Sequence, residues 1–285
     1  MIAAFDIGGS RIKAARVAAG KITRIGEAET PANDLGAFAA ALSRLAGDAS
    51  AVAISIAGIV DPDSGLATVA NIPCLHGTPV VETLQAMLHR PVLVLNDADC
   101  FALAEARRGA GRGHANVFGI ILGTGVGGGL VIDGRLVSGA GGFAGEWGHG
   151  PIVCHPALPC GCGQIGCLDT VGGAKGLERL HHALTNERLD ARQIVSSRPK
   201  TMAEWLKIIA GPLAMVVNVV GASVVPVGGG LGNNAALVAT LDQAVRARIL
   251  RKTQAPLVVT AQCGADAGLI GAAEAGLAAF GTGAA

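Results

Sequence analysis

The amino-acid sequence predicts an α/β fold in which helices cover both faces of the sheets. Two observations predict this class. Apolar segments of strand length alternate with helix-like segments along the 285 residues, which is typical of sheets buried between helices. The order strand, glycine turn, strand opens the chain and occurs again near Asn116. This repeat predicts two related domains that flank a cleft.

The chain is expected to open with a hairpin. Met1–Asp6 is apolar and leads into a glycine turn, and residues 11–17 alternate with a period of about two, as paired strands do. A helix is expected at 35–45, with Asn33 or Asp34 as its N-cap. The other elements expected in this half are strands at 51–56 and 92–95 and helices at 80–89 and 97–110.

The second half of the chain repeats this opening. Val117–Leu122 predicts a buried strand, Gly123–Gly129 a glycine turn and Leu130–Ile132 the returning strand, which ends at an Asp-Gly turn. The other expected elements are helices at 174–184, 203–220, 234–250 and 266–280, strands at 223–227 and 257–260, and a glycine turn at 228–230.

Composition and charge exclude several classes of protein. Hydrophobic residues make up 51% and charged residues 15% of the chain, the opposite of a disordered protein. With 22 Lys and Arg against 21 Asp and Glu, we expect no nucleic-acid or anionic-membrane partner. The uncharged run 208–241 contains Pro212, Pro226 and three consecutive glycines, which argues against a membrane-spanning helix. Asp6 interrupts the first apolar run, so no signal peptide and a cytoplasmic protein are predicted.

The glycine-rich turns are candidate phosphate sites. Residues 123–128 fit G-x-G-x-x-G, but the dinucleotide-binding fingerprint requires a helix next, and 130–137 instead predict strand, turn and strand. No Gly-Lys-Ser/Thr completes a P-loop. Successive amides of a glycine turn bind anions, so matched turns at 8–10 and 123–125, together with 228–230, predict a bound nucleotide. The alternative is a pair of ordinary hairpin turns.

Two carboxylates follow predicted strands directly. Asp6 ends the first strand beside a glycine turn, where it could hold Mg²⁺ through water; the alternative is a residue that caps the turn. Asn96 and Asp97 follow the strand at 92–95, and α/β folds place ligands at the carboxyl ends of strands. Asp97 is therefore a candidate general base that takes a proton from a hydroxyl as it attacks phosphorus. The alternative is an N-cap of the next helix.

The cysteine pattern predicts a metal site. The chain has seven cysteines, and an odd number argues against a disulfide framework. Cys160, Cys162 and Cys167 lie within eight residues, and with His149 they would make a closed, tetrahedral, structural Zn²⁺ site. Two other residues, His155 and Cys154, are rival fourth ligands. The alternative is three buried thiols without a metal.

His149 also predicts the kind of substrate. If one ring nitrogen binds zinc, the other is fixed in direction and can meet a hydroxyl. Glu146, three residues earlier, could accept hydrogen bonds from neighbouring hydroxyls. A polyol is therefore the expected ligand.

Taken together, these motifs resemble the ROK family (repressor, open reading frame, kinase) of sugar kinases along nearly the whole chain. The motifs that carry the resemblance are residues 6–10, 55–61, 70–73, 96–98, 122–129, 145–149, the Cys-x-Cys-x4-Cys loop, 228–230 and 267–273. Within the family, residues 96–103 and 119–123 look most like those of bacterial N-acetylglucosamine kinases.

The resemblance implies the actin-like ATPase (ribonuclease H-like) fold. Its N-terminal domain would span 1–110, completed by a C-terminal helix at about 266–285, and its second domain would span 111–265 with a zinc loop at 149–167. The implied activity is transfer of phosphoryl from ATP to the 6-hydroxyl of a hexose or N-acetylhexosamine, with N-acetylglucosamine expected. Alternatives are a glucokinase, fructokinase or N-acetylmannosamine kinase. A sugar-responsive transcriptional regulator is disfavoured, because the first phosphate loop begins at Asp6 and leaves no helix-turn-helix before it. The family also implies a homodimer.

The resemblance implies a role for each matching residue. ATP and Mg²⁺ would be bound by Asp6, Gly8, Gly9, Ser10, Lys13, Gly123, Thr124, Gly125, Gly228, Gly229 and Gly230. The sugar would be bound by Asn71, Asn96, Asp97, Glu146, His149 and Asp169, with Asp97 as the base, and structural zinc by His149, Cys160, Cys162 and Cys167.

The chain departs from the family pattern at three places. Asp169 stands where the family usually has Glu, so this carboxylate is one methylene shorter. Residues 74–77 replace a tryptophan-containing loop, and Gly172–Gly173 replaces a usual serine.

Overall fold

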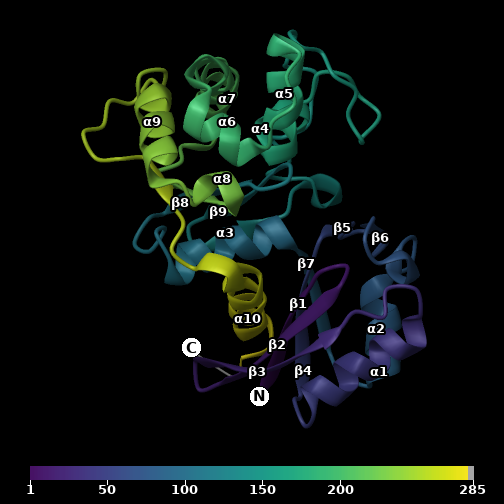
Figure 1. The fold of residues 1–285 in the computed structure, drawn as a ribbon. Helices are drawn as coiled ribbons and strands as arrows, with labels where there is room; N and C mark the ends of the chain where they lie inside the picture. The colour runs from purple at the N-terminus through teal and green to yellow at the C-terminus, as the bar shows by residue number, and fades with distance from the viewer. Residues whose placement is uncertain (282–285) are drawn as a thin grey trace. The chain divides into compact units, whose positions relative to one another are not determined.

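The computed structural model describes residues 1–281, which group into two compact units (Figure 1). Unit 1 comprises Met1–Arg107, Leu136–Ala144 and the described residues from Cys263 onward, and unit 2 comprises Arg108–Arg135 and Gly145–Gln262. The segment Leu136–Ala144 thus belongs to unit 1, whereas the sequence-based bounds place it in the second domain. Those bounds stay a prediction, and residues 282–285 of the predicted C-terminal helix lie outside the described residues.

Unit 1 is built on a five-stranded sheet with the order β3-β2-β1-β4-β7. Strands β1, β4 and β7 are parallel, and the hairpin partners β2 and β3 are antiparallel. The strands are β1 (Ile2–Ile7), β2 (Arg11–Ala18), β3 (Lys21–Glu29), β4 (Ala51–Ile56) and β7 (Val92–Asn96), with a separate pair β5 (Gly58–Val60) and β6 (Ala67–Val69). The helices are α1 (Leu35–Ala46), α2 (Val80–Leu88), α3 (Asp97–Arg108) and α10 (Ala267–Phe280).

The alternation of β1 divides the core of unit 1 between two faces of the sheet. Ala3, Phe5 and Ile7 are buried with the apolar side chains of α1 and α2, whereas Ile2 and Ala4 are buried with those of α10 and with Cys100 of α3. Successive side chains of a strand point to opposite faces of its sheet. A strand whose side chains are apolar on both faces therefore requires helices that cover both faces. The sequence prediction of a doubly covered sheet is confirmed for this unit.

Unit 2 repeats the strand arrangement of unit 1. The four strands of its sheet that lie wholly in this unit have the order β9-β8-β11-β12, in which β8, β11 and β12 are parallel and β9 is the antiparallel hairpin partner of β8. The strands are β8 (Asn116–Leu122), β9 (Val126–Ile132), β11 (Val225–Gly228) and β12 (Val258–Thr260), and β10 (Arg135–Val137) contains the point where the chain passes to unit 1. The helices are α4 (Asp169–Gly172), α5 (Ala174–Thr185), α6 (Ala191–Ser197), α7 (Pro199–Val220), α8 (Gly229–Gly232) and α9 (Ala235–Arg246).

Several sequence-based expectations need correction. The glycine turn expected at 123–129 occupies only the residues between β8 and β9, because Val126–Ile132 already forms a strand. Gly228–Gly230 is not a simple turn, since Gly228 ends β11 and α8 begins at Gly229. The sequence analysis also missed β3 and α6.

Helix α7 has the length and composition needed to cross a membrane, and no other helix among the described residues does. It continues through Pro212, as the helix expected at 203–220 does, and it begins four residues earlier, at Pro199. One face packs into unit 2: Trp205 is fully buried and donates a hydrogen bond from Nε1 to the Gly172 carbonyl at 3.0 Å. This packing is that of a core helix in a globular unit.

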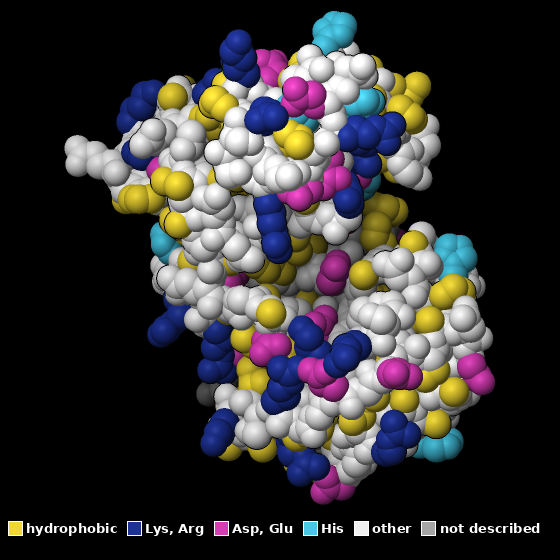
Figure 2. Space-filling view, in the orientation of Figure 1, with side chains coloured by type: hydrophobic (Ala, Val, Ile, Leu, Met, Phe, Trp, Pro, Cys, Tyr) yellow, Lys and Arg dark blue, Asp and Glu magenta, His cyan; other side chains and the backbone are white. Residues whose placement is uncertain are grey.

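Charges on the visible face of the molecule are mixed in both units (Figure 2). Lysine and arginine side chains lie among aspartate and glutamate side chains on this face. This distribution agrees with the net charge of +1. It offers no single-sign patch on this face that would attract a polyanion.

Candidate functional site

The β1–β2 turn of unit 1 presents exposed backbone at Gly8, Gly9 and Ser10. The Gly8 amide donates to the Arg11 carbonyl at 2.9 Å, and the Thr30 hydroxyl donates to the Gly8 carbonyl at 2.8 Å, so the residue that follows β3 also holds the turn. A Cβ on Gly9 would lie 3.0 Å from Asn71, which places this predicted sugar ligand directly beside the predicted phosphate turn.

Asp6 lies at the base of this turn next to a cation and a helix start. It pairs with Lys13 across the hairpin, and Lys13 Nζ is 3.4 Å from Asp6 Oδ2 while it donates to the Ala265 carbonyl at 2.7 Å. A Cβ on Gly268 would lie only 2.5 Å from Asp6 Oδ1, so the first turn of α10 packs against the carboxylate. The Asp6 carboxylate thus lies between the Lys13 ammonium and the start of α10.

The carboxyl ends of the three parallel strands of unit 1 are level. Ile7 pairs with Ile56, and Ile56 pairs with Asn96. The strand edge therefore brings Asp6 and the Asn96–Asp97 pair to the same end of the sheet, as the sequence analysis expected from the α/β class.

Asn96, rather than Asp97, caps helix α3. Its Oδ1 accepts hydrogen bonds from the amides of Ala98 at 2.7 Å and Asp99 at 3.3 Å, and its Nδ2 donates to the Gly58 carbonyl at 3.0 Å. The alternative of Asp97 as the cap is thus wrong. Asp97 is half-buried at the first helical position, where its Oδ1 accepts from the Ala98 amide at 2.9 Å.

The β8–β9 turn of unit 2 is held by the start of helix α5. The Ala174 and Lys175 amides donate to the carbonyls of Gly123 at 2.7 Å and Thr124 at 3.2 Å. Gly229 has a φ of +83°, and a Cβ there would lie 2.5 Å from the Leu122 carbonyl carbon. The two glycine elements predicted for nucleotide binding in this unit therefore lie side by side.

A cavity of about 950 Å³ opens beside these glycines. It is lined by Gly123, Thr124 and Gly230, which the sequence analysis named, and by Ala174, Glu178, Asp190, Ala191, Arg192, Val195, Ser196, Leu231, Asn233 and Asn234, which it missed. The α6 residues were missed because no helix was expected there. The sequence does contain a signal for the start of this helix. Asp190 and Gln193 form a capping box, and a D-x-x-Q sequence is typical of this motif.

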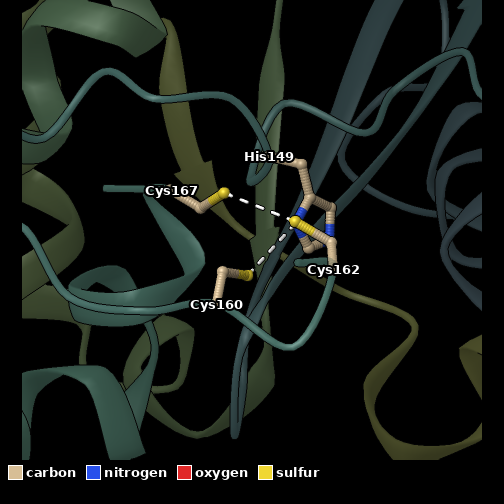
Figure 3. Close-up of side chains that lie close together, drawn as sticks. All are labelled: His149, Cys160, Cys162 and Cys167. Atoms are coloured by element: carbon tan, nitrogen blue, oxygen red, sulfur yellow. Dashed lines mark hydrogen bonds between the residues drawn. The ribbon is translucent and has the colours of Figure 1, made fainter. Parts of the chain in front are cut away.

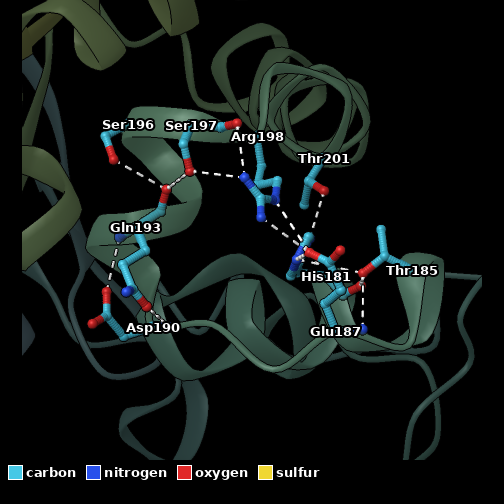
Figure 4. A network of polar contacts seen from close by, with 9 residues as sticks. All are labelled: His181, Thr185, Glu187, Asp190, Gln193, Ser196, Ser197, Arg198 and Thr201. Carbon is cyan, nitrogen blue, oxygen red and sulfur yellow. Dashed lines mark hydrogen bonds and ion pairs between the residues drawn. The ribbon is translucent and has the colours of Figure 1, made fainter.

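A polar network ties α6 to its neighbours beside this cavity (Figure 4). Arg198 Nη2 is 3.1 Å from Glu187 Oε2, and the same oxygen is 3.5 Å from Nε2 of the fully buried His181. His181 Nδ1 lies 2.8 Å from the Thr201 hydroxyl of α7. One buried imidazole thus joins α5, α7 and the loop before α6, and it fixes the cavity wall.

The predicted zinc ligands come together (Figure 3). The ligand atoms of His149, Cys160, Cys162 and Cys167 all lie within 4.8 Å of one another. Cys160 Sγ is 3.7 Å from His149 Nδ1, and Cys162 Sγ is 3.6 Å from Cys167 Sγ. Sulfur ligands of a tetrahedral Zn²⁺ with bonds of about 2.3 Å lie about 3.8 Å apart. The donor set and its spacing therefore fit zinc.

The structure does not support the two alternatives to the His149, Cys160, Cys162 and Cys167 ligand set, which were other ligands and three buried thiols. The rival ligands His155 and Cys154 are not part of the converging group in residues 1–281. Of the three clustered thiols only Cys167 is buried, and Cys162 is exposed, so a set of three buried thiols is excluded. His149 turns Nδ1 to the sulfurs and Nε2 to Glu146 Oε2, 3.7 Å away. Burial raises the pKa of the Glu146 carboxyl, and His149 opposes that shift.

The glycines of β9 allow the segment Gly145–His149 to pack closely on the strand. The Trp147 indole donates from Nε1 to the Gly127 carbonyl at 2.9 Å, and a Cβ on Gly128 would lie 2.8 Å from its ring. A Cβ on Gly145 would lie 2.5 Å from the Gly128 carbonyl oxygen. The segment that carries Glu146 and His149 therefore lies directly on the strand, which a sequence reading of these glycines as turn residues could not reveal.

Comparison with known proteins agrees with these features. Residues 2–277 match the family described as "ROK family". A relative from Shewanella sp. (strain ANA-3), named N-acetylgalactosamine kinase AgaK, is 35% identical over 296 residues that cover 95% of each chain. A relative from Pasteurella multocida (strain Pm70), named N-acetyl-D-glucosamine kinase, is 34% identical over 294 residues, 94% of this chain and 97% of the relative.

A solved structure is similar along the whole chain. A ROK family glucokinase from Streptomyces griseus in complex with glucose and AMPPNP has a TM-score of 0.74 and 28% identity, and the match covers 96% of this chain and 98% of that one. The likeness confirms the predicted actin-like ATPase fold.

Proposed function

The chain belongs to the ROK family, and from this premise we propose that it is an ATP-dependent sugar kinase that phosphorylates N-acetylglucosamine at its 6-hydroxyl. The observation that carries the proposal is the end-to-end match to relatives named N-acetylhexosamine kinases, at 35% and 34% identity. The enzyme is thus a phosphotransferase with an alcohol acceptor. N-acetylgalactosamine, N-acetylmannosamine, glucose and fructose are the alternative acceptors.

Asp97 is the proposed general base. Its carboxylate follows β7 at the carboxyl edge of the parallel strands, where ligands bind in α/β folds. It would accept the proton of the 6-hydroxyl as that oxygen attacks the terminal phosphorus of ATP. The Asn96 cap supports this role, because it fixes the first turn of α3 and leaves the Asp97 backbone no freedom to shift.

The glycine elements are proposed to bind the nucleotide. Backbone amides of the turns at 8–10 and 123–125, other than those of Gly8 and Gly123, which donate within their own turns, would donate to phosphate oxygens together with Gly228–Gly230 and the Lys13 ammonium. The cavity of about 950 Å³ beside Thr124 and α6 is the proposed site of the nucleoside. Mg²⁺ neutralises phosphate charge in such reactions, and Asp6 is the carboxylate proposed to hold it, since Mg²⁺ prefers oxygen ligands.

The sugar is proposed to contact the side chains of Asn71 and Asn96 in unit 1 and of Glu146 and His149 in unit 2. Zinc on His149 and the three cysteines would have a structural role, because four protein ligands leave no position for a reactant. It would hold the His149 ring so that Nε2 faces Glu146 and the sugar hydroxyls.

A coupled ADP-release assay over these five sugars tests the proposal. We expect the highest kcat/KM with N-acetylglucosamine, and NMR of the product should place the phosphate on C6. Absence of ADP release with every sugar, from protein that binds an ATP analogue, would contradict the kinase assignment. In that case a gel shift against candidate operator DNA would test the other class, a sugar-responsive regulator.

We further propose that the enzyme is a cytoplasmic homodimer. Met215 and Val219 lie one turn apart on α7 and are 69% and 78% exposed. Leu250 is also exposed, and its amide donates to Asn218 Oδ1 at 2.9 Å, which places it beside them. Exposed apolar patches of this kind occur at protein interfaces. Light scattering of the wild type and of Met215→Lys tests this, because loss of the patch should yield monomers.

A further inference from the structure

Asp169 joins the zinc-ligand loop to the β8–β9 turn. It begins α4 two residues after Cys167, and its Oδ1 accepts a hydrogen bond from the Val126 amide at 2.7 Å. Val126 is the first residue of β9 and follows the Gly123–Gly125 turn directly. A carboxylate 43 residues away therefore fixes the end of the proposed phosphate turn.

Gly125 leaves the room that this carboxylate occupies. A Cβ built on Gly125 would overlap Asp169 Oδ1, and its three nearest atoms all belong to the Asp169 carboxyl group. Unlike Gly229, Gly125 does not have a positive φ. Its backbone would accept alanine, so the neighbouring carboxylate is what excludes a side chain there.

The backbone of Asp169 is itself held from two directions. Its amide donates to the Gly148 carbonyl at 2.8 Å, next to the predicted zinc ligand His149. Arg179 of α5 donates to the carbonyls of Thr170 at 2.9 Å and Asp169 at 3.4 Å. The carboxylate is thus supported by the same helix whose first amides bind the turn, and it cannot follow the turn if the turn moves.

We propose that Asp169 is a positioning residue for the nucleotide: its carboxylate holds the Val126 amide and so sets the direction of the Thr124 and Gly125 amides, which are the proposed donors to the phosphates, whereas the Gly123 amide donates to the Gly125 carbonyl within the turn. This assignment rests on the proposed function only in naming the ligand of the turn. It differs from the sugar contact that the family resemblance implies for this position.

The first test removes the acceptor and then restores it. Asp169→Ala should accelerate hydrogen exchange at the Val126 amide in the ligand-free protein and weaken Mg-AMPPNP binding about tenfold, the effect of one lost hydrogen bond to a charged group. Asp169→Asn keeps an acceptor oxygen, so exchange and affinity should stay near wild type. Glu204→Ala, which removes an exposed carboxylate paired with Lys207 in the same unit, is the matched control.

The second test is a double-mutant cycle, which remains decisive if Asp169→Ala lowers stability. Gly125→Ala in the wild type should raise KM for ATP about tenfold, because the new methyl displaces the turn or the carboxylate. In the Asp169→Ala background the same change should alter KM for ATP less than about twofold, since the colliding atoms are gone. Thermal unfolding of each variant verifies that it is folded.

Three outcomes would overturn the proposal. One is unchanged exchange at Val126 in Asp169→Ala. Another is an effect of Gly125→Ala that is equal in both backgrounds. A third is a raised KM for the sugar with unchanged Mg-AMPPNP affinity, which would make Asp169 a direct sugar ligand. Wild-type protein that binds Mg-AMPPNP but phosphorylates no sugar would instead refute the kinase activity and leave the exchange and affinity results to decide this inference.

Discussion

The glycine turns of the two units have the same place in the strand order but different support. The turn at 8–10 in unit 1 is exposed and is held by Thr30, the residue after β3, and by contact with Asn71. The turn at 123–125 in unit 2 is half-buried at its two glycines and exposed at Thr124, and it is held by the first amides of α5 and by Asp169. The repeated sequence pattern thus makes equivalent hairpins, and the elements packed on each hairpin decide what it can do.

The chemistry of the two units differs in the same way. Unit 1 places carboxylates, Asp6 and Asp97, at the carboxyl edge of its sheet. Unit 2 instead lays the Gly145–His149 segment on β9 and joins it to a Cys₃His cluster. We therefore expect changes in unit 1 to act mainly on turnover and changes in unit 2 to act mainly on stability and nucleotide affinity.

Removal of zinc should have the largest effect and should be confined to unit 2. A structural site contributes its binding free energy to folding, so chelation should lower the melting temperature by about 10 °C or more, several kcal/mol in a domain of this size. Thermal unfolding with and without chelator and hydrogen exchange of residues 145–172 measure this. Elemental analysis that finds no zinc in fresh protein would contradict it.

Asp97→Asn should have the second largest effect, and it should lower the rate of phosphoryl transfer without changing stability. Loss of a general base lowers kcat by about 10²–10⁴, while sugar affinity measured by calorimetry should change little because the amide has nearly the same shape. A variant that keeps wild-type turnover would show that Asp97 is not the base. The melting temperature is the control.

Gly128→Ala should lower the free energy of unfolding by about 1–3 kcal/mol, as overpacking does. The new Cβ would lie 2.8 Å from Trp147 and 3.0 Å from the Gly145 carbonyl oxygen. The matched control is Gly211→Ala on α7, where a Cβ meets nothing within 4 Å, and which should stabilise by about 0.5–1 kcal/mol. Equal effects of the two changes would refute the packing role of the β9 glycines.

Asn96→Ala should have the smallest effect on stability, about 1 kcal/mol for loss of an N-cap. Asn96→Asp retains an oxygen that can accept from the Ala98 amide, so most of this stability should return. Chemical denaturation of the three proteins gives the comparison. If both variants raised KM for the sugar without lowering stability, Asn96 would be a sugar ligand and not chiefly a cap.

Local patterns predicted the β1–β2 and β8–β9 hairpins, the parallel strands and most helices, because apolar periodicity and glycine turns are strong signals in short windows. They did not separate the turn glycines 123 and 125 from the strand glycines 127–129, since glycine suits both a turn and a closely packed strand. The capping role of Asn96 depends on side-chain direction, which no spacing encodes. The hydrogen bond between Asp169 and Val126 joins residues that are distant in sequence, so no local pattern predicts it.

The C-terminal helix α10 completes a unit that begins with the first strand. Leu269, Ala272 and Ala273 share an apolar cluster with Ile2 and Ala4. A growing polypeptide on the ribosome therefore presents one bare face of its first sheet until the last helix emerges, by which time every residue of unit 2 has been made. Nascent chains stalled after residue 262 should show protease resistance in unit 2 and sensitivity in unit 1. The first strands to be synthesised thus wait for a helix near the other end of the sequence, and chaperones would have to shield them longest.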